Sequence, residues 1–436
     1  MFLIIFLIMS GLLTFNLNLF LIISLVETMI SELSVENFKC LKQISIKLKP
    51  LTVFIGPNGS GKSSILQSIL ILKRLFVTQG AGISIQGLFH IDKYIDMGTW
   101  EDVVFDNSKP IKIALKVVEN DAQMLLDTTF SRDSKVSLDV KILIGGIENT
   151  FSKIIVLPYQ PKQSQSVSIR FKEGSLSGSW DGFNLTITSV AGRVSDEVKN
   201  AIMSLLNSWH RKVFFIPAST SMFRMPQVNI GWQSKSDILD AIKSSSIADE
   251  AHLIALLATD PDTEDYVLKC VKKLFGIEVR GRPLPTNVAR IISSIRKGKT
   301  IPIVNEGGGI NRCIYTFTIL ALADAESTIM IEEPETNLHP KAQYDLAGTF
   351  TEAVTKERKQ IIITTHSEHL LFGILQQIRK KEVKREEIAI YYVQKDAKDG
   401  KTVVEELEID EHGRVKGGLP GFFEEEVREL VGLLGE

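Results

Sequence analysis

The sequence predicts an α/β fold whose mainly parallel sheet is divided by a long insertion. Two stretches carry the sheet: an apolar strand followed by a helix at residues 51–75, and alternating strands and helices from residue 329 to 393. Between them, residues 103–213 contain short alternating segments separated by Gly, Asp, Asn and Ser, which is typical of antiparallel sheet. Because alternating strands and helices indicate a parallel sheet, we expect the two ends of the chain to form one core.

The first elements are expected to be three strands, a loop and a helix. Residues 31–38 and 44–48 alternate polar and apolar side chains, which predicts two half-buried strands. Residues 51–55 form a short apolar run that ends abruptly at a Gly-Pro-Asn-Gly turn, as a buried strand does. Residues 63–75 carry Ile and Leu at helical spacing, so a helix is predicted to follow the turn.

The insertion is predicted to begin as sheet and to continue as helix. Strands are expected in four alternating segments: 111–117, 136–144, 166–171 and 184–189. From residue 237 to about 296 the apolar residues fall at helical spacing, which predicts helices. The short apolar run 213–216 is expected to return to the core as a strand.

The last third of the chain resumes the pattern of a parallel sheet. Strands are expected at 329–331, 360–364 and 388–393, and helices at 313–322, 341–355 and 368–379. The predicted organisation has five parts: a leader (1–28), two parts of one core (29–106 and 300–394), the insertion between them (107–299) and a small C-terminal extension (395–436).

The composition excludes few classes of protein. The 436 residues are enough for a large core. The 50 basic and 52 acidic residues nearly cancel, which argues against a protein that coats nucleic acid by overall charge but leaves a local basic patch open. Cys40, Cys270 and Cys313 are widely spaced, without a CxxC pair. The sequence therefore predicts neither a disulfide framework nor a zinc site, and it favours a reducing compartment.

The first 26 residues carry no charge and exceed the roughly 20 apolar residues that cross a bilayer. A signal peptide fits poorly, because a basic n-region and a small-residue cleavage site are missing. Two interpretations stay open. The segment is a membrane anchor with the rest of the chain in the cytoplasm, or natural translation starts at Met29. We favour the second, because strand-like sequence from Ile30 would leave a spanning helix almost no linker.

The turn after the third strand carries the strongest motif. The pattern GxxxxGK[ST] is satisfied by Gly56-Pro57-Asn58-Gly59-Ser60-Gly61-Lys62-Ser63. The glycines let backbone amides surround phosphate, and the following helix offers its positive end. Lys62 supplies a cation for the β- and γ-phosphates, the Ser63 hydroxyl can ligate Mg²⁺, and Ser64 is a further expected ligand. A chance match arises in only about 2 of 100 chains, so a P-loop for ATP is predicted.

Two later strands end in polar residues of the kind that nucleotide hydrolysis needs. The strand at 329–331 delivers Glu332 and Glu333 to its carboxyl end, where open α/β sheets bind their ligands. Glu332 is expected to hold Mg²⁺ and Glu333 to polarise the attacking water. The strand at 360–364 leads to His366, whose neutral imidazole can hydrogen-bond the γ-phosphate. We therefore predict Lys62, Glu333 and His366 as catalytic residues.

A glycine triplet precedes the apolar helix at 313–322. The segment Asn305-Glu306-Gly307-Gly308-Gly309-Ile310-Asn311-Arg312 places three glycines at a helix start, which makes a second anion-binding end. Taken alone, however, the segment is better interpreted as a flexible loop.

Together these residues resemble the ABC-type ATPase heads of the SMC/RecF class, and most closely the overcoming-lysogenization-defect (OLD) family. The opening Leu33-Ser34-Val35-Glu36-Asn37-Phe38-Lys39 is similar to the N-terminus of that group. The segment Glu332-Glu333-Pro334-Glu335-Thr336-Asn337-Leu338-His339-Pro340 resembles its Walker B and D-loop, and Thr364-Thr365-His366-Ser367 its H-loop. By this likeness the segment Gly307–Arg312 takes the place of the ABC signature motif, with Gly308, Gly309 and Asn311 as the expected ligands. The tail around 409–423 resembles a C-terminal extension found in one branch.

The resemblance implies a P-loop NTPase of ABC/RecF type with an antiparallel β lobe and a mixed, partly helical insertion. It also implies that ATP closes a homodimer between the P-loop of one subunit and the signature loop of the other, with Asn337 and His339 near the seam. Glu332 stands where ABC proteins usually have Asp, and the signature region lacks an LSGGQ-like serine. Gln86 is the candidate Q-loop residue. About 40 residues follow residue 394, so no built-in nuclease domain is expected.

Two functions stay open. The first is an ATP-driven switch that acts on DNA or with a partner nuclease, in genome maintenance or in defence. Two basic clusters could supply a DNA surface: Lys269, Lys272, Lys273, Arg280 and Arg282, and Arg296, Lys297 and Lys299. A third cluster, Arg379-Lys380-Lys381, is weakened by the acids at 386–387. The alternative is a regulatory or scaffold ATPase that binds only protein, at a membrane if the leader is real.

Overall fold

The computed structural model describes residues 30–91, 93–160, 164–218, 228–229, 234–284, 288–295 and 299–417. The hydrophobic leader and the end of the C-terminal extension lie outside the described residues, and so does the tail segment at 419–423. Within the described ranges, no helix combines the length and the apolar character needed to cross a membrane.

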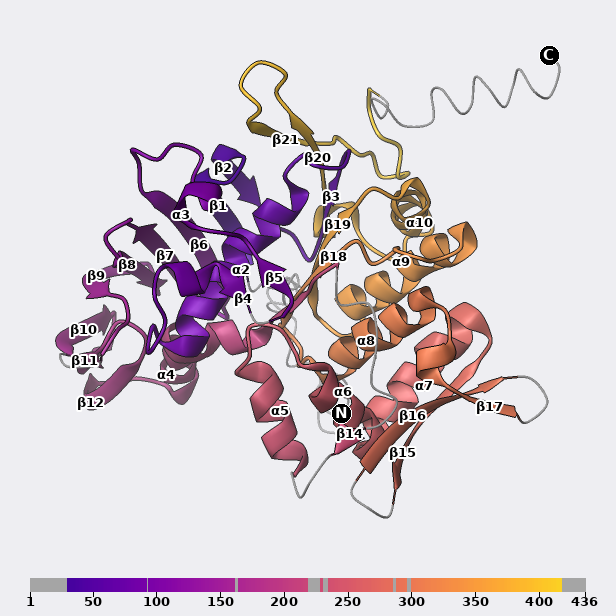
Figure 1. The fold of residues 1–436 in the computed structure, drawn as a ribbon. Helices are drawn as coiled ribbons and strands as arrows, with labels where there is room; N and C mark the ends of the chain where they lie inside the picture. The colour runs from indigo at the N-terminus through magenta and orange to yellow at the C-terminus, as the bar shows by residue number, and fades with distance from the viewer. Residues whose placement is uncertain are drawn as a thin grey trace, which may run out of the picture.

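The centre of the molecule is a six-stranded sheet built from distant parts of the chain (Figure 1). Its strands, in spatial order, are β13 (Val213–Ile216), β18 (Thr328–Glu332), β19 (Gln360–Thr365), β3 (Leu51–Ile55), β20 (Ile388–Lys395) and β21 (Thr402–Glu406). The first five strands pair in parallel and β21 is antiparallel. The predicted return of 213–216 to the core as a strand is confirmed.

Both faces of this sheet are buried, because alternate residues of each strand enter different cores. Leu51, Val53 and Ile55 of β3 join the cluster of α8 (Gly308–Leu322), α9 (Pro340–Thr355) and α10 (Glu368–Arg379). Phe54 points to the opposite cluster, which contains the apolar side of α2 (Lys62–Thr78). Burial on both faces explains why these strands are continuous apolar runs. The helices predicted at 63–75, 341–355 and 368–379 are all confirmed.

An antiparallel lobe covers α2 on the side away from the other core helices (Figure 1, left). Its six-stranded sheet has the spatial order β2 (Leu41–Lys47), β1 (Ile30–Phe38), β6 (Ile111–Glu119), β7 (Ala122–Phe130), β8 (Lys135–Ile144) and β9 (Ile147–Val156). A second sheet consists of β10 (Gln165–Phe171), β11 (Gly174–Trp180) and β12 (Leu185–Gly192). The predicted antiparallel character of the insertion is therefore confirmed, and the first two strands of the chain belong to the same lobe.

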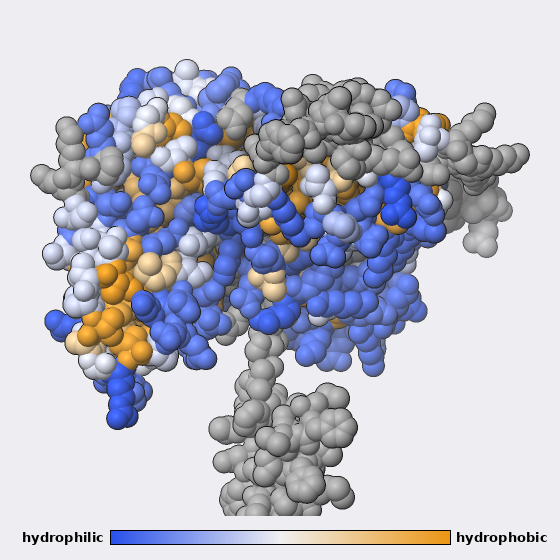
Figure 2. Space-filling model, turned by 90° about the horizontal axis from the view of Figure 1, so that it is seen from below, coloured by the Kyte–Doolittle hydropathy of each residue, from blue (hydrophilic) through white to orange (hydrophobic). Residues whose placement is uncertain are grey.

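Large apolar side chains are exposed on β8, β9 and β12 of the lobe: Leu143, Ile154, Val156 and Val190. Figure 2 shows apolar surface gathered at the lower left, on the side of this lobe. Short elements connect the lobe to the core: η1 (Gln86–Leu88), β4 (His90–Ile91), β5 (Ile95–Asp96), α3 (Trp100–Val103), α4 (Asp196–Met203), a π-helical turn η2 (Ser204–Ser208) and η3 (Trp209–Lys212).

In the rest of the insertion, the prediction of helices is only partly correct. Helices α5 (Lys235–Lys243), α6 (Glu250–Thr259) and α7 (Pro261–Phe275) are present, but the helical prediction up to residue 296 is wrong. Gly276 ends α7 with a left-handed φ of 68°, a conformation that favours glycine. Strands follow it: β15 (Glu278–Leu284), β16 (Val288–Ile295) and β17 (Lys299–Pro302), with β14 (Val228–Asn229) at the edge. The β-branched residues of β16 favour this antiparallel pairing over helix.

Candidate nucleotide-binding site

The glycine-rich loop lies between β3 and the first turn of α2, as the sequence predicts. Pro57, Asn58 and Gly59 are exposed, whereas Gly56 and Ser60 are buried. Gly61 has a φ of 107°, which an L-residue adopts only with strain, and it is the residue directly before α2. The loop thus places backbone amides at the positive end of a 17-residue helix, an arrangement that suits an anion.

Lys62 lies inside this loop. Its side chain is buried and its Nζ donates to the carbonyl oxygens of Gly56, at 2.7 Å, and Pro57, at 2.8 Å. Burial lowers the pKa of Lys62, while the carboxylates of Glu333 and Glu335 act in the opposite direction. The ammonium group is therefore held between the loop and the acidic residues of the neighbouring strand ends.

The sheet brings the three predicted motifs to one edge. β19 pairs in parallel with β18 on one side and with β3 on the other, so Glu332 lies beside Thr364, and Thr365 lies beside Ile55. The peptide of Glu333 is tied to the same neighbour, because its N–H donates to the carbonyl of Thr364 at 2.8 Å. Three carboxyl ends of adjacent parallel strands therefore meet, which is where α/β sheets bind ligands.

Glu332 has the surroundings of a metal ligand. It is 5% exposed, and its Oε2 accepts the N–H of Ala218 at 3.1 Å. Its Oε1 is buried and accepts no hydrogen bond within the described part of the chain. Burial raises the pKa of Glu332, and the Ala218 amide and the nearby Ser63 hydroxyl oppose that change. A buried carboxylate oxygen without a donor, close to a hydroxyl, fits the oxygen ligands that Mg²⁺ prefers.

Glu333 and His366 face each other beside this carboxylate. Glu333 has a left-handed backbone, φ 45°, which turns the chain sharply at the end of β18. Its carboxylate is 30% exposed and lies 3.8 Å from Nδ1 of His366, whose side chain is 47% exposed. A partly solvated carboxylate next to an imidazole can hold and deprotonate a water molecule.

Glu335 is a site residue for which no individual role was predicted. Its side chain is 2% exposed, and its Oε1 accepts the hydroxyl of Thr365 at 2.6 Å and the backbone N–H of His366 at 3.1 Å. The same oxygen lies 3.6 Å from Nδ1 of His366. Burial raises the pKa of Glu335. Glu335 therefore fixes the turn that carries His366. The signal in the sequence for this role was the position of Glu335 in the segment that follows Glu333.

Arg312 is the second residue without a predicted role. It is completely buried in the first turns of α8, and it donates to the carbonyls of Glu332, Pro217 and Ala218, the last at 2.9 Å. Burial lowers its pKa, and the three acids 332, 333 and 335 oppose that change. Arg312 thus links α8 to the metal-ligand candidate. A single cation at the start of an apolar helix was the signal in the sequence.

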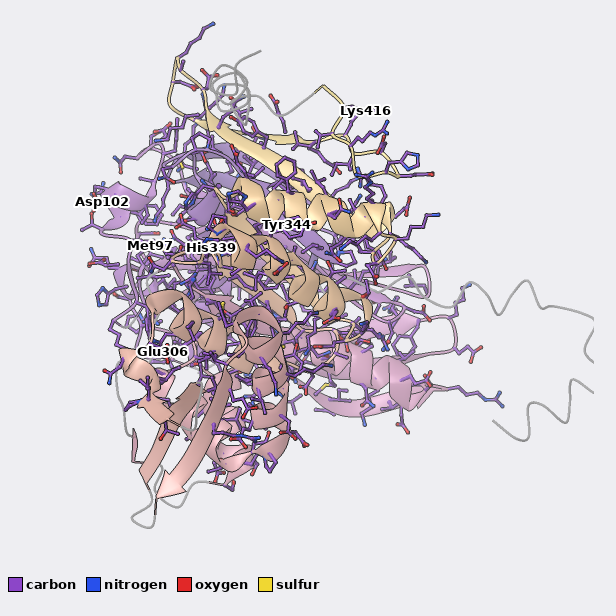
Figure 3. The ribbon with its side chains drawn as sticks, turned by 90° about the vertical axis from the view of Figure 1, so that its right-hand side faces the viewer. Met97, Asp102, Glu306, His339, Tyr344 and Lys416 are labelled. Carbon is purple, nitrogen blue, oxygen red and sulfur yellow. The ribbon has the colours of Figure 1, made fainter. Side chains whose placement is uncertain are left out.

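The predicted signature residues lie in the first turn of α8. Gly309 is buried so closely that a Cβ there would lie 2.4 Å from the carbonyl oxygen of Asn337. Gly308 begins α8 and is half-buried, whereas the amide of Asn311 donates to the carbonyl of Ile303 at 2.9 Å. Figure 3 places Glu306 and His339 on the same side of the molecule, in agreement with this contact.

Three further predicted residues have the following positions. Ser60 is buried and its hydroxyl has no hydrogen-bond partner among the described residues. The hydroxyl of Ser64 accepts a weak hydrogen bond from the thiol of Cys40 at 3.6 Å. Gln86, the Q-loop candidate, begins a short 3-10 helix and is exposed.

Comparison with known proteins places the chain in a family. Residues 51–371 match the family model described as "AAA domain, putative AbiEii toxin, Type IV TA system". The chain belongs to this AAA-domain family. A second model, described as "Protein of unknown function (DUF3696)", matches residues 383–433. The predicted resemblance to AAA-type proteins of the OLD kind is confirmed.

A curated relative of this AAA-domain protein is the OLD nuclease of Thermus scotoductus, which is 24% identical over 392 residues. The match covers 85% of the chain and 65% of the relative. Solved structures with similarity include an SMC head bound to the C-winged helix domain of ScpA (TM-score 0.48, 15% identity, 87% of this chain and 98% of that one). An SMC head of Thermotoga maritima has a TM-score of 0.41 at 12% identity, covering 88% and 100%.

Proposed function

We propose that the chain binds ATP with Mg²⁺ and hydrolyses it. The observation that carries this proposal is the meeting of Lys62, Glu332, Glu333 and His366 at one edge of the parallel sheet. Lys62 and the loop amides would hold the phosphates, and Ser63 with Glu332 would hold the metal ion. Bound Mg²⁺ would neutralise charge on the phosphates. Glu333 would then take the proton of the attacking water, with His366 placed by Glu335.

The decisive experiment removes only the proposed base. Glu333→Gln keeps the size of the side chain and loses its basicity, so ATP binding is expected to persist while turnover falls about 10²-fold or more. A matched control is Glu326→Gln, which changes a partly exposed acid that is paired with Arg358. Turnover by Glu333→Gln at the wild-type rate, or a wild-type protein that ignores ATP, would refute the proposal.

We further propose that ATP closes a homodimer. Support comes from Gly309 in the signature-like segment, which is packed against the D-loop segment at Asn337. A nucleotide contacted by two subunits favours the closed state through its higher affinity for that state. Glu333→Gln should therefore accumulate as a dimer in ATP and as a monomer without it, as measured by light scattering. An unchanged mass would contradict this part.

The proposed partner is DNA, handled with a nuclease in genome maintenance or defence; the similarity to an OLD nuclease supports it. The first predicted basic cluster gives little support. Lys272, Lys273 and Arg280 are paired with Glu278, Glu352 and Glu264 at 3.0, 3.1 and 3.5 Å. The side chains of Arg282, Arg296, Lys297 and Lys299 lie outside the described residues.

A better DNA surface is the end of α10, which the sequence disfavoured. Arg379, Lys380 and Lys381 are exposed, and Arg379 lines a groove of about 390 Å³ with His412 and Arg414. The weakening expected from residues 386–387 is partly removed, because Glu387 is buried and accepts the N–H of Lys384. The helix dipole favours cations at the C-terminal end of any helix. That effect accounts for the cations at the end of α10 but not for Arg414, which lies outside the helix.

A duplex-binding assay separates this surface from the paired cluster. Arg379→Glu with Lys380→Glu should weaken binding and reduce its salt dependence by roughly one to two ions. The control, Lys272→Glu with Arg280→Glu, should have the smaller effect because those cations are already neutralised. No DNA binding by the wild type at low salt would instead favour a scaffold ATPase that binds only protein.

A further inference from the structure

The antiparallel hairpin of β20 and β21 forms one edge of the central sheet (Figure 1, top). Thr402, the first residue of β21, is 4% exposed, and its hydroxyl donates to the carbonyl of Ser60 at 2.9 Å. Its backbone N–H donates to the carbonyl of Cys40 at 2.8 Å. One residue of the C-terminal segment therefore joins the P-loop to the turn between β1 and β2.

The P-loop packs tightly against Thr402 at Gly61. A Cβ at Gly61 would lie 2.2 Å from the Thr402 hydroxyl oxygen and 2.8 Å from the Cys40 sulfur. Real Cβ atoms do not approach other atoms so closely, so Gly61 is required by the contact as well as by its φ. The thiol of Cys40 also donates to the hydroxyl of Ser64. Thr402 and Cys40 therefore both pack closely against the loop at Gly61.

The hairpin that carries Thr402 is itself fixed in place. At its tip, the N–H of Asp396 donates to the carbonyl of Lys401 at 2.8 Å. At its base, Tyr391 stacks on Phe54 of β3, with ring centroids 5.5 Å apart, and its hydroxyl donates to the carbonyl of Lys47 at 2.7 Å. Thr402 is therefore presented by a strand with restricted movement.

The direction of the hydrogen bond from Thr402 to Ser60 determines how the loop peptide is oriented. In a trans peptide the carbonyl and the following N–H point in opposite directions. Because the Ser60 carbonyl is held toward Thr402, the N–H of Gly61 is held away from the hairpin, and amides of this loop are the groups that surround phosphate. We infer that Thr402 is a positioning residue for the nucleotide loop, and hence that the segment matching the model of unknown function belongs to the ATP site. This inference rests on the proposed ATP binding.

The test is a set of three variants titrated with a fluorescent ATP analogue and Mg²⁺. Thr402→Val keeps the shape but removes the donor, so the Kd should rise roughly tenfold, the equivalent of about 1.4 kcal/mol. Thr402→Ser restores a hydroxyl and should return the Kd to within about twofold of wild type. Thr318→Val is the matched control, because its buried hydroxyl donates to the Ile314 carbonyl within α8.

Two further readouts distinguish positioning from simple stability. The melting temperature without nucleotide should fall similarly for Thr402→Val and Thr318→Val, whereas only the first should raise the KM for ATP more than it lowers kcat. Equal Kd values for Thr402→Val and wild type would overturn the inference. So would failure of Thr402→Ser to recover binding. If wild type itself does not bind the analogue, the proposed function has failed instead, which this design separates.

Discussion

Arg312→Met tests whether the buried guanidinium holds in place the strand that carries Glu332, the proposed Mg²⁺ ligand. The side chain has no exposed surface and donates to the carbonyls of Glu332, Pro217 and Ala218. Met has a similar length but donates nothing, so these carbonyls lose their donor and the nearby acids lose a buried counter-charge. Breaking a buried charged set costs about 3–5 kcal/mol, against a typical stability of about 5–15 kcal/mol.

The loss is measured as the shift of the urea midpoint, followed by tryptophan fluorescence, together with turnover at saturating ATP. Arg132→Met is the control for this substitution, because Arg132 pairs with Glu101 at the surface and both side chains are exposed. That exposed pair should contribute less than about 1 kcal/mol. Arg312→Lys keeps the charge without the planar fork of donors, so it should lie between the two in stability.

Turnover should fall further than stability alone predicts, because Arg312 holds the carbonyl of the proposed Mg²⁺ ligand. If Arg312→Met unfolds at the same urea concentration as Arg132→Met, then the guanidinium does not stabilise the strand end. If Arg312→Met is destabilised but its folded form turns over ATP normally, then the link between α8 and Glu332 has no catalytic role.

Three other changes have defined outcomes. Glu335→Ala removes the acceptor for the backbone N–H of His366, so kcat should fall about tenfold or more with the Kd for ATP little changed; an equal loss in both would assign Glu335 to binding. Mg²⁺-dependent ATP binding should be lost on acidification at a higher pH than an ordinary carboxyl predicts, because burial raises the pKa of Glu332 and the protonated acid cannot ligate metal. It should also weaken at alkaline pH earlier than a normal lysine predicts, because burial lowers the pKa of Lys62; a flat profile in isothermal calorimetry would contradict both. Gly309→Ala should push the Asn337 backbone away and reduce ATP-dependent dimerisation measured by light scattering, while leaving monomeric ATP binding intact.

The sequence predicted correctly those features that depend on residue spacing within one short segment. The Gly56–Ser63 motif, the apolar strands and the helix at 368–379 depend on spacing within a few residues, so they were predicted closely. The stretch at 278–295 was predicted as helix because short apolar runs fit either periodicity. Gly276 was the signal in the sequence that the helix ends there. The residues after it form strands because β15 and β16 pair with each other.

By itself, the sequence determined the identity of the loop, the acids and the histidine, because backbone preference and side-chain chemistry are local properties. Only the tertiary structure decided that Glu335 fixes His366, that Arg312 holds Glu332, and that Thr402 holds Ser60 from 342 positions away. These bonds join segments whose separation carries no spacing pattern. They exist because the parallel sheet brings distant strand ends to one edge, where buried polar groups must find partners.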